Sequence, residues 1–187
     1  MKIRIIVCLF LTLPYLLGAQ KSKFITKKYL VDLENKKNSL SQHIHNQSFV
    51  LIFLSAECPI SQKYAPILRG MQEQYSEVKF VAVFTKWDKT LAIQEYLKNY
   101  PLSMRVLRDK KNNLIKKIDA RITPEAFLFD KNGVLIYRGA IDNWFYSLGK
   151  YRPEASEHYL ADAIQLSLKN ELIKIKQTDA IGCIIEK

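Results

Sequence analysis

The chain has 187 residues, 48% of them hydrophobic and 25% charged, which is enough for one globular domain with its own core. Its formal net charge is +11 at pH 7, a value that favours anionic surfaces. No zinc-finger spacing or RNA-binding aromatic signature accompanies this charge, so we expect no nucleic-acid partner. The lysines are scattered through predicted turns and helix faces, as on an ordinary solvated surface.

Residues 1–19 have the layout of a secretory signal peptide. Basic residues precede the apolar run IIVCLFLTLPYLLG, and GAQ offers a small residue for cleavage. The run is short for a membrane span and is interrupted by Pro14; an uncleaved anchor is the alternative. We therefore expect an exported protein, periplasmic or secreted, that meets the membrane only transiently through this segment. Residues 20–28 are basic and mostly polar and form a predicted lead-in segment.

A domain over residues 29–170 is predicted next. It opens with a short strand, a polar turn around Asn35 and a short helix that begins at Ser39 or Ser41. The continuous apolar run at 49–56 predicts a strand buried on both faces, as in a sheet covered by helices.

From Pro59 onwards the apolar residues recur every three or four positions as far as Tyr75, which predicts an amphipathic helix. Pro59 suits the first helical turn, where a missing N–H costs nothing, whereas Pro66 falls in the interior and should kink the helix.

The remaining pattern continues the alternation of strands and helices. The predicted elements are a strand at 78–85, a helix at 89–100, a short strand at 104–109, a short helix at 110–120, strands at 125–129 and 134–138 around an Asn-Gly turn, a polar aromatic loop, and a helix at 157–168. Residues 171–187 form a tail that carries Cys183. This order predicts an α/β fold with a central mixed sheet, mostly parallel, that has helices on both faces and antiparallel edge strands from the hairpin.

Cys58 stands where the buried strand gives way to the helix. Unpaired N–H groups and the helix dipole at a helix N-terminus favour negative charge, so this position lowers the pKa of a thiol and raises the fraction of the nucleophilic thiolate. The alternative is that Cys58 is a small buried hydrophobe. A cysteine at a strand-to-helix switch, followed by a proline, favours the reactive interpretation.

The segment CPISQKYAPIL resembles the active-site helix of the thioredoxins, which has a cysteine, a second redox position three residues on, and a helix-kinking proline eight residues after the cysteine. ITPEAF resembles the loop in which thioredoxins carry a cis-proline facing that cysteine. With YRGAID and the terminal GC-I, the ordered set is similar to exported redoxin proteins of the alkyl hydroperoxide reductase and thiol-antioxidant superfamily, over roughly residues 28–187.

This resemblance implies a thioredoxin-like fold in which Pro124 is cis and Thr123 presents its backbone to a substrate chain. It also implies an exported thiol–disulfide oxidoreductase that uses Cys58 as the nucleophile. Its substrates would be protein thiols or disulfides, an external thiol would be the reductant, and no cofactor or metal would be needed.

Two positions depart from the thioredoxin pattern. Ser61 occupies the second position of the CxxC pair, so Cys58 cannot resolve a mixed disulfide locally. Ile52 stands where thioredoxins keep a buried acid. Glu57, next to Cys58, could take part of that role or could raise the thiol pKa by repulsion.

A peroxidase of the same superfamily remains an alternative. Such an enzyme would show a P-x-x-x-T-x-x-C frame with an arginine beside the thiolate. Ser55 matches the hydroxyl position, but Leu51 stands where the proline should be. Arg121, three residues before Pro124, is the candidate arginine, and only the fold can place it near Cys58. A further alternative is a thioredoxin-fold binding module that has lost turnover.

Cys183 is the distant partner that Cys58 could use, because it is the other cysteine left after removal of residues 1–19. We predict that the tail brings Cys183 to Cys58 as a resolving cysteine. The alternatives are a free Cys183 or one that links two copies of the chain. The pairing requires Cα atoms within roughly 7 Å.

Two further sets of residues are candidates for binding. His43 and His45 alternate, which on a strand would place both rings on one side, but Ser61 removes a ligand that a copper or zinc site with Cys58 would need. Glu57, Pro59 and Ser61 border the nucleophile, and Trp144 lies in an aromatic cluster that forms either a self-packed loop or a binding lip near the active site.

Overall fold

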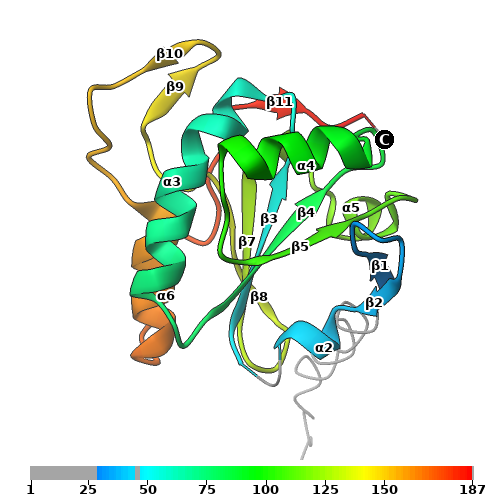
Figure 1. Cartoon of the computed structure of the whole chain (residues 1–187). Helices are drawn as coiled ribbons and strands as arrows, with labels where there is room; N and C mark the ends of the chain where they lie inside the picture. The colour runs from blue at the N-terminus through cyan, green and yellow to red at the C-terminus, as the bar shows by residue number, and fades with distance from the viewer. Residues whose placement is uncertain (1–28, 45–46, 187) are drawn as a thin grey trace, which may run out of the picture.

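The computed structural model describes residues 29–44 and 47–186, and the predicted signal peptide and lead-in segment lie outside the described residues. A seven-stranded sheet runs through the middle of the molecule in the order β2-β1-β5-β4-β3-β7-β8 (Figure 1). The strands of this sheet are β1 (Tyr29–Val31), β2 (Lys37–Ser39), β3 (Phe49–Leu54), β4 (Lys79–Phe84), β5 (Arg105–Arg108), β7 (Glu125–Phe129) and β8 (Leu135–Gly139).

Helices cover both faces of the sheet. They are α2 (Ser41–Ile44), α3 (Pro59–Gln74), α4 (Thr90–Asn99), α5 (Asn113–Ile118) and α6 (Tyr159–Leu168). Buried side chains of α3, α4 and α6 join one hydrophobic cluster, and those of α2 and α5 join a second cluster. The predicted α/β architecture, a thioredoxin-like fold with helices on both faces of a mixed sheet, is confirmed. The expectation that the sheet is mostly parallel is wrong, because only β3–β4 and β4–β5 pair in parallel and the other four pairs are antiparallel.

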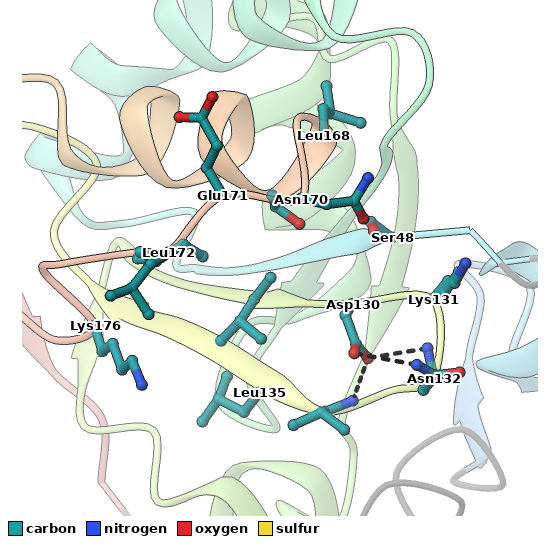
Figure 2. Close-up of a pocket in the computed structure, with 14 residues that line it drawn as sticks. Ser48, Asp130, Lys131, Asn132, Leu135, Leu168, Asn170, Glu171, Leu172 and Lys176 are labelled. Carbon is teal, nitrogen blue, oxygen red and sulfur yellow. Dashed lines mark hydrogen bonds between the residues drawn. The ribbon is translucent and has the colours of Figure 1, made fainter.

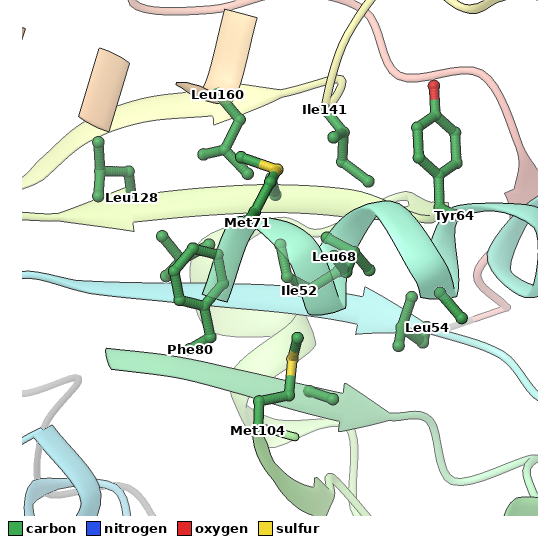
Figure 3. Close-up of a cluster of buried hydrophobic side chains, with 14 of the residues drawn as sticks. Ile52, Leu54, Tyr64, Leu68, Met71, Phe80, Met104, Leu128, Ile141 and Leu160 are labelled. Atoms are coloured by element: carbon green, nitrogen blue, oxygen red, sulfur yellow. The ribbon is translucent and has the colours of Figure 1, made fainter. Parts of the chain in front are cut away.

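The central strand β3 divides its side chains between the two clusters. Val50, Ile52 and Leu54 point into the first cluster, while the alternate residues of the strand point into the second. Figure 3 shows Ile52 and Leu54 lying among side chains of α3, α6 and the neighbouring strands. Burying each aliphatic side chain of this kind contributes about 1.5–3 kcal/mol, so the apolar run at 49–56 fixes the position of the strand that leads to Cys58.

Strand direction brings separate parts of the chain to one edge of the sheet. β3 pairs with β4 in parallel and with β7 antiparallel. The carboxyl end of β3, which leads to Cys58, therefore lies beside the amino end of β7, which follows Thr123 and Pro124. The fold itself thus juxtaposes two segments that are 65 positions apart.

Several of the shortest strands carry no sequence signal of their own. β2 pairs with β1 in a hairpin at the edge opposite β8, with Asn35 at φ 64° in its turn. The aromatic loop contains a hairpin of β9 (Phe145–Ser147) and β10 (Lys150–Tyr151). Strands of two or three residues are too short to show a period, so their partners rather than the local pattern define them.

The tail also pairs with the body of the protein at two places. Gln177 bridges Arg138 at the edge of β8, and β11 (Cys183–Ile184) pairs antiparallel with β6 (Ile122–Thr123). In the part of the chain that the structure describes, no helix has the length and apolar character needed to cross a membrane.

Candidate active site

Cys58 is the N-cap residue of α3 and is almost completely buried, with an exposed fraction of 1%. Its backbone is extended, and its N–H donates to the carbonyl of Ser55 at 3.2 Å. As predicted, Pro59 occupies the first helical turn and Pro66 lies inside the helix. Pro59 is exposed. The thiol therefore sits at the positive end of a sixteen-residue helix dipole.

The peptide bond between Thr123 and Pro124 is cis, as the resemblance implies. Thr123 is buried, and its carbonyl oxygen accepts a hydrogen bond from the Cys58 Sγ at 3.1 Å. The segment that precedes β7 therefore touches the sulfur through its main chain.

The strand β11 brings Cys183 to this same place. Cys183 is paired in register with Thr123, and the Thr123 hydroxyl donates to the Cys183 carbonyl at 3.4 Å. Cys183 lies close enough to Cys58 for each cysteine to shift the pKa of the other, and both cysteines are free thiols. The two cysteines whose pairing the sequence predicts are thus in contact, and β11 crosses near the carboxyl end of β3 (Figure 1).

The environment of Cys58 favours its thiolate. Burial raises the pKa of Cys58, but hydrogen bonds from the side chain of Cys183, from the N–H and hydroxyl of Ser61 and from the N–H of Cys183 outweigh burial. The net result is a pKa below the ordinary value of a thiol. Ser61, at the second position of the pair, therefore acts as a donor to the sulfur.

Cys183 has the opposite preference. Burial, the hydrogen bond to Cys58 and the charge of the Cys58 thiolate together raise the pKa of Cys183 to about 12. When the reduced pair loses a proton, the proton therefore leaves Cys58, while Cys183 keeps its own.

Ser61 is itself held by the surrounding structure. It is fully buried, its hydroxyl accepts from the N–H of Ser55 at 3.3 Å, and its carbonyl accepts from the Tyr96 hydroxyl at 2.9 Å. Burial, together with the charges of Cys58 and Tyr100, raises the pKa of Tyr96, so Tyr96 remains a neutral donor.

Asp88 is a site residue that the sequence analysis missed. Its carboxylate is buried and accepts from the Ser55 hydroxyl at 2.9 Å and the Ala56 N–H at 2.7 Å. The same carboxylate accepts from the N–H and the hydroxyl of Thr85 at 3.0 and 2.7 Å. Asp88 therefore joins the loop that carries Cys58 to the loop that follows β4.

Trp87 and Asn112 were also missed. The Trp87 indole N–H and the Asn112 side-chain amide both donate to the carbonyl oxygen of Glu186, each at 3.1 Å. We call these two donors the Glu186 clamp. The sequence does not predict them, because a tryptophan in a loop and an asparagine before a helix form no motif. Their shared acceptor is 99 positions from Trp87 and 74 positions from Asn112.

The remaining predicted site residues lie at the periphery. Glu57 is exposed. Trp144 packs edge-on against Tyr64 at 5.5 Å and donates its indole N–H to the Arg152 carbonyl at 2.9 Å. Burial and a hydrogen bond to Asp142 raise the pKa of Tyr64. These contacts are those of a loop that packs on its own aromatic side chains and on α3.

The peroxidase and metal-site hypotheses each depend on particular side chains. The guanidinium of Arg121, the candidate for a peroxidase arginine, pairs with Asp119. His43 lies in α2 and His45 lies outside the described residues. Within the described ranges, no group of three or more His, Cys, Asp or Glu side chains is arranged to hold a metal ion.

A pocket of about 610 Å³ lies at the other end of the sheet. It is formed by the turn between β7 and β8 and by the segment that follows α6, including Asp130, Leu135, Leu168 and Leu172 (Figure 2). Because β7 runs antiparallel to β3, this turn is beside Phe49, at the end of the sheet opposite to Cys58. The pocket is therefore separate from the thiol site.

A buried, activated cysteine at a helix N-terminus, facing a cis-proline loop, places the protein in the thioredoxin-like class. Residues 18–138 match the model of the AhpC/TSA family, and the chain belongs to this family. In sequence, the chain is 27% identical over 121 residues to the thiol-disulfide oxidoreductase ResA of Bacillus thuringiensis, covering 64% of this chain and 67% of the relative.

Solved structures show the same fold. A hypothetical protein from Sinorhizobium meliloti superposes with a TM-score of 0.72 at 21% identity, covering 86% of this chain and 91% of the other. A secreted disulfide oxidoreductase from Mycobacterium tuberculosis superposes with a TM-score of 0.58 at 17% identity, covering 76% and 97%.

Proposed function

We propose that this protein is an exported thiol–disulfide oxidoreductase in which Cys58 is the nucleophile and Cys183 is the resolving cysteine. The observation that carries the proposal is the pairing of β11 with β6, because it sets Cys183 in register with Thr123, whose carbonyl oxygen accepts from the Cys58 Sγ at 3.1 Å. Family membership and the named activity of the Bacillus relatives support this reaction class. Export is inferred from the signal-like residues 1–19.

The first step is attack on a partner disulfide. The Cys58 thiolate forms a bond to one partner sulfur, and the other partner sulfur leaves as a thiolate that takes up a proton from water. Ser61 and Cys183 stabilise the attacking anion by hydrogen bonding. The Thr123 carbonyl oxygen contacts the Cys58 sulfur, and Pro124 follows Thr123 directly. These two residues therefore border the sulfur and shape the access of a substrate to it.

The second step is resolution by Cys183. Two of the causes that raise its pKa, the hydrogen bond to Cys58 and the negative charge of Cys58, disappear once Cys58 is bound in a mixed disulfide. The Cys183 thiol then loses its proton more readily, and its sulfur attacks Cys58 and expels the second partner thiolate. Two electrons have passed to the partner, and an external thiol reductant restores both cysteines. The same steps in reverse oxidise a partner dithiol.

An intact-mass redox titration of the full chain, with alkylation and peptide mapping at each potential, tests this proposal. We expect a reversible intramolecular Cys58–Cys183 disulfide. Cys58→Ser should abolish thiol exchange, and Cys183→Ser should accumulate the mixed disulfide with a peptide disulfide substrate. Peptide mapping distinguishes these two cysteines from Cys8.

Three outcomes would contradict the proposal. Cysteines that never pair would remove Cys183 from the mechanism. Retention of a binding partner by Cys58→Ser, without any exchange by the parent protein, would indicate a binding module. Rapid consumption of peroxide by the reduced protein would indicate a peroxidase.

A further inference from the structure

The tail segment that follows Cys183 is fastened beyond the β6–β11 ladder. The N–H of Ile185 donates to the Arg121 carbonyl at 2.8 Å, and the next carbonyl, that of Glu186, accepts both donors of the Glu186 clamp. Glu186 is only three positions from Cys183. The clamp therefore holds the chain within three residues of the Cys183 thiol.

Both donors of the clamp belong to the body of the protein. Asn112 is fully buried in a left-handed conformation with φ 51°, and its amide oxygen faces the Lys86 N–H at 3.4 Å. The backbone N–H of Trp87 donates to the Thr85 hydroxyl at 3.2 Å. That hydroxyl in turn donates a hydrogen bond to the Asp88 carboxylate. The donors are thus positioned by contacts that do not involve the tail.

The Trp87 ring donates to the Glu186 carbonyl although most of the ring is exposed. Its exposed fraction is 58%, and the Lys86 ammonium lies 4.5 Å from its ring centroid. An indole this exposed contributes little to the hydrophobic core. Its hydrogen bond to the Glu186 carbonyl is therefore its main specific contact with the tail.

We propose that Trp87 and Asn112 are positioning residues for the Cys58–Cys183 disulfide. By holding the Glu186 carbonyl, they raise the effective concentration of Cys183 at Cys58 and set how well Cys183 competes with an outside thiol for the Cys58 sulfur. The inference rests on the proposed function, since it concerns the same pair of cysteines.

The equilibrium with glutathione measures this competition. Oxidised glutathione takes two electrons from the protein dithiol, which forms the Cys58–Cys183 bond, and yields two molecules of reduced glutathione. The equilibrium constant of this exchange is proportional to the effective concentration of Cys183 at Cys58. A residue with a merely structural role would change the unfolding free energy and leave this constant unaltered.

The decisive variants are Trp87→Phe, which keeps a ring and removes the N–H, and Asn112→Asp, which replaces the donor amide with an acceptor. We expect each to lower the equilibrium constant by about two- to tenfold, the size of one net hydrogen bond. Asn170→Asp is the matched control, because Asn170 has a similar backbone, with φ 56°, and lines the pocket at the end of the sheet opposite to Cys58. It should leave the constant unchanged.

Because Asn112 is buried, its variant could fail to fold, and the exposed Trp87 keeps the test decisive. An unchanged constant in folded Trp87→Phe would overturn the clamp while leaving the proposed function intact. Absence of the Cys58–Cys183 disulfide in the parent chain, in contrast, would overturn the proposed function itself.

Discussion

Gly182 lies directly against the main chain of Thr123: a Cβ atom on residue 182 would come within 2.1 Å of the Thr123 carbonyl oxygen. That oxygen is also the one that accepts the hydrogen bond from the Cys58 Sγ. The close approach of the tail to Cys58 therefore depends on the absence of a side chain at this position.

The first prediction is that Gly182→Ala displaces β11 from β6. The contact is with backbone rather than with a flexible side chain, so the strand must move, and overpacking of this kind costs about 1–3 kcal/mol. We expect the glutathione equilibrium constant for the Cys58–Cys183 disulfide to fall by about five- to a hundredfold, a range that corresponds to this cost.

Gly70→Ala is the control for that change. Gly70 lies in α3 with nothing within 4 Å of a Cβ there, so alanine should stabilise the helix by about 0.5–1 kcal/mol. Its disulfide equilibrium should match that of the parent chain. If Gly182→Ala behaved like Gly70→Ala, the close packing of the tail on Thr123 would be irrelevant to pairing.

The second prediction separates the hydrogen bond of Cys183 from its sulfur chemistry. Cys183→Ala removes a group that lowers the pKa of Cys58 and should raise that pKa, because a hydrogen bond to a charged group is worth about 1.5–3 kcal/mol. Cys183→Ser keeps an O–H donor and should keep the pKa low. Ultraviolet absorbance of the thiolate against pH measures both. Equal pKa values in the two variants would contradict the donor role.

The third prediction concerns stability against pH in the reduced protein. The pKa of Cys58 is lowered from 9.0 on folding, so its contribution is present above the unfolded value and is lost as pH falls through the folded value. The pKa of Cys183 is raised from 9.0 to about 12, so its contribution is present below pH 9.0 and is lost as pH rises towards about 12. We therefore expect the stability difference from a Cys58→Ala/Cys183→Ala double variant to be greatest near pH 9.0. Denaturant unfolding across this range measures it, and a difference that does not vary with pH would refute the assignment.

The fourth prediction concerns Asp88. Asp88→Asn replaces one acceptor oxygen with an amide group that faces donors already present at Ala56 or Thr85, which leaves a buried N–H unpaired. We expect a loss of about 1–3 kcal/mol in the free energy of unfolding and slower attack by Cys58 on a peptide disulfide. Glu154→Gln, which removes the same charge from an exposed residue, should change stability by less than about 0.5 kcal/mol. A stable, fully active Asp88→Asn protein would show that the two loops do not depend on this carboxylate.

Local patterns were sufficient for the scaffold of the site. The apolar run at 49–56 predicted β3, the helical period predicted α3, and the position of Cys58 between them was confirmed. The cis bond before Pro124 followed from the resemblance to thioredoxins, since no local pattern specifies it. The contact of the tail with Cys58 was predicted from the count of cysteines, not from any strand signal.

The rest depends on contacts between distant residues. β6 and β11 have two residues each, and the paired Thr123 and Cys183 are 60 positions apart. Asp88 acts on a loop more than thirty positions earlier in the chain. No local sequence motif marks a buried polar side chain of this kind. Only the folded chain shows which main-chain groups form hydrogen bonds with it.

The bridge between the tail and β8 limits how far the Cys183 sulfur can travel. Thr178 donates its N–H to the Arg138 carbonyl at 3.1 Å, and its hydroxyl is bonded to Tyr137 and to the N–H of Ala140. Cys183 follows only five residues later, a length of chain that spans at most about 17 Å when fully extended. Even with β11 separated from β6 to admit a partner, Cys183 would stay within this distance of Thr178, from which it can return to Cys58 once the partner's first sulfur has left.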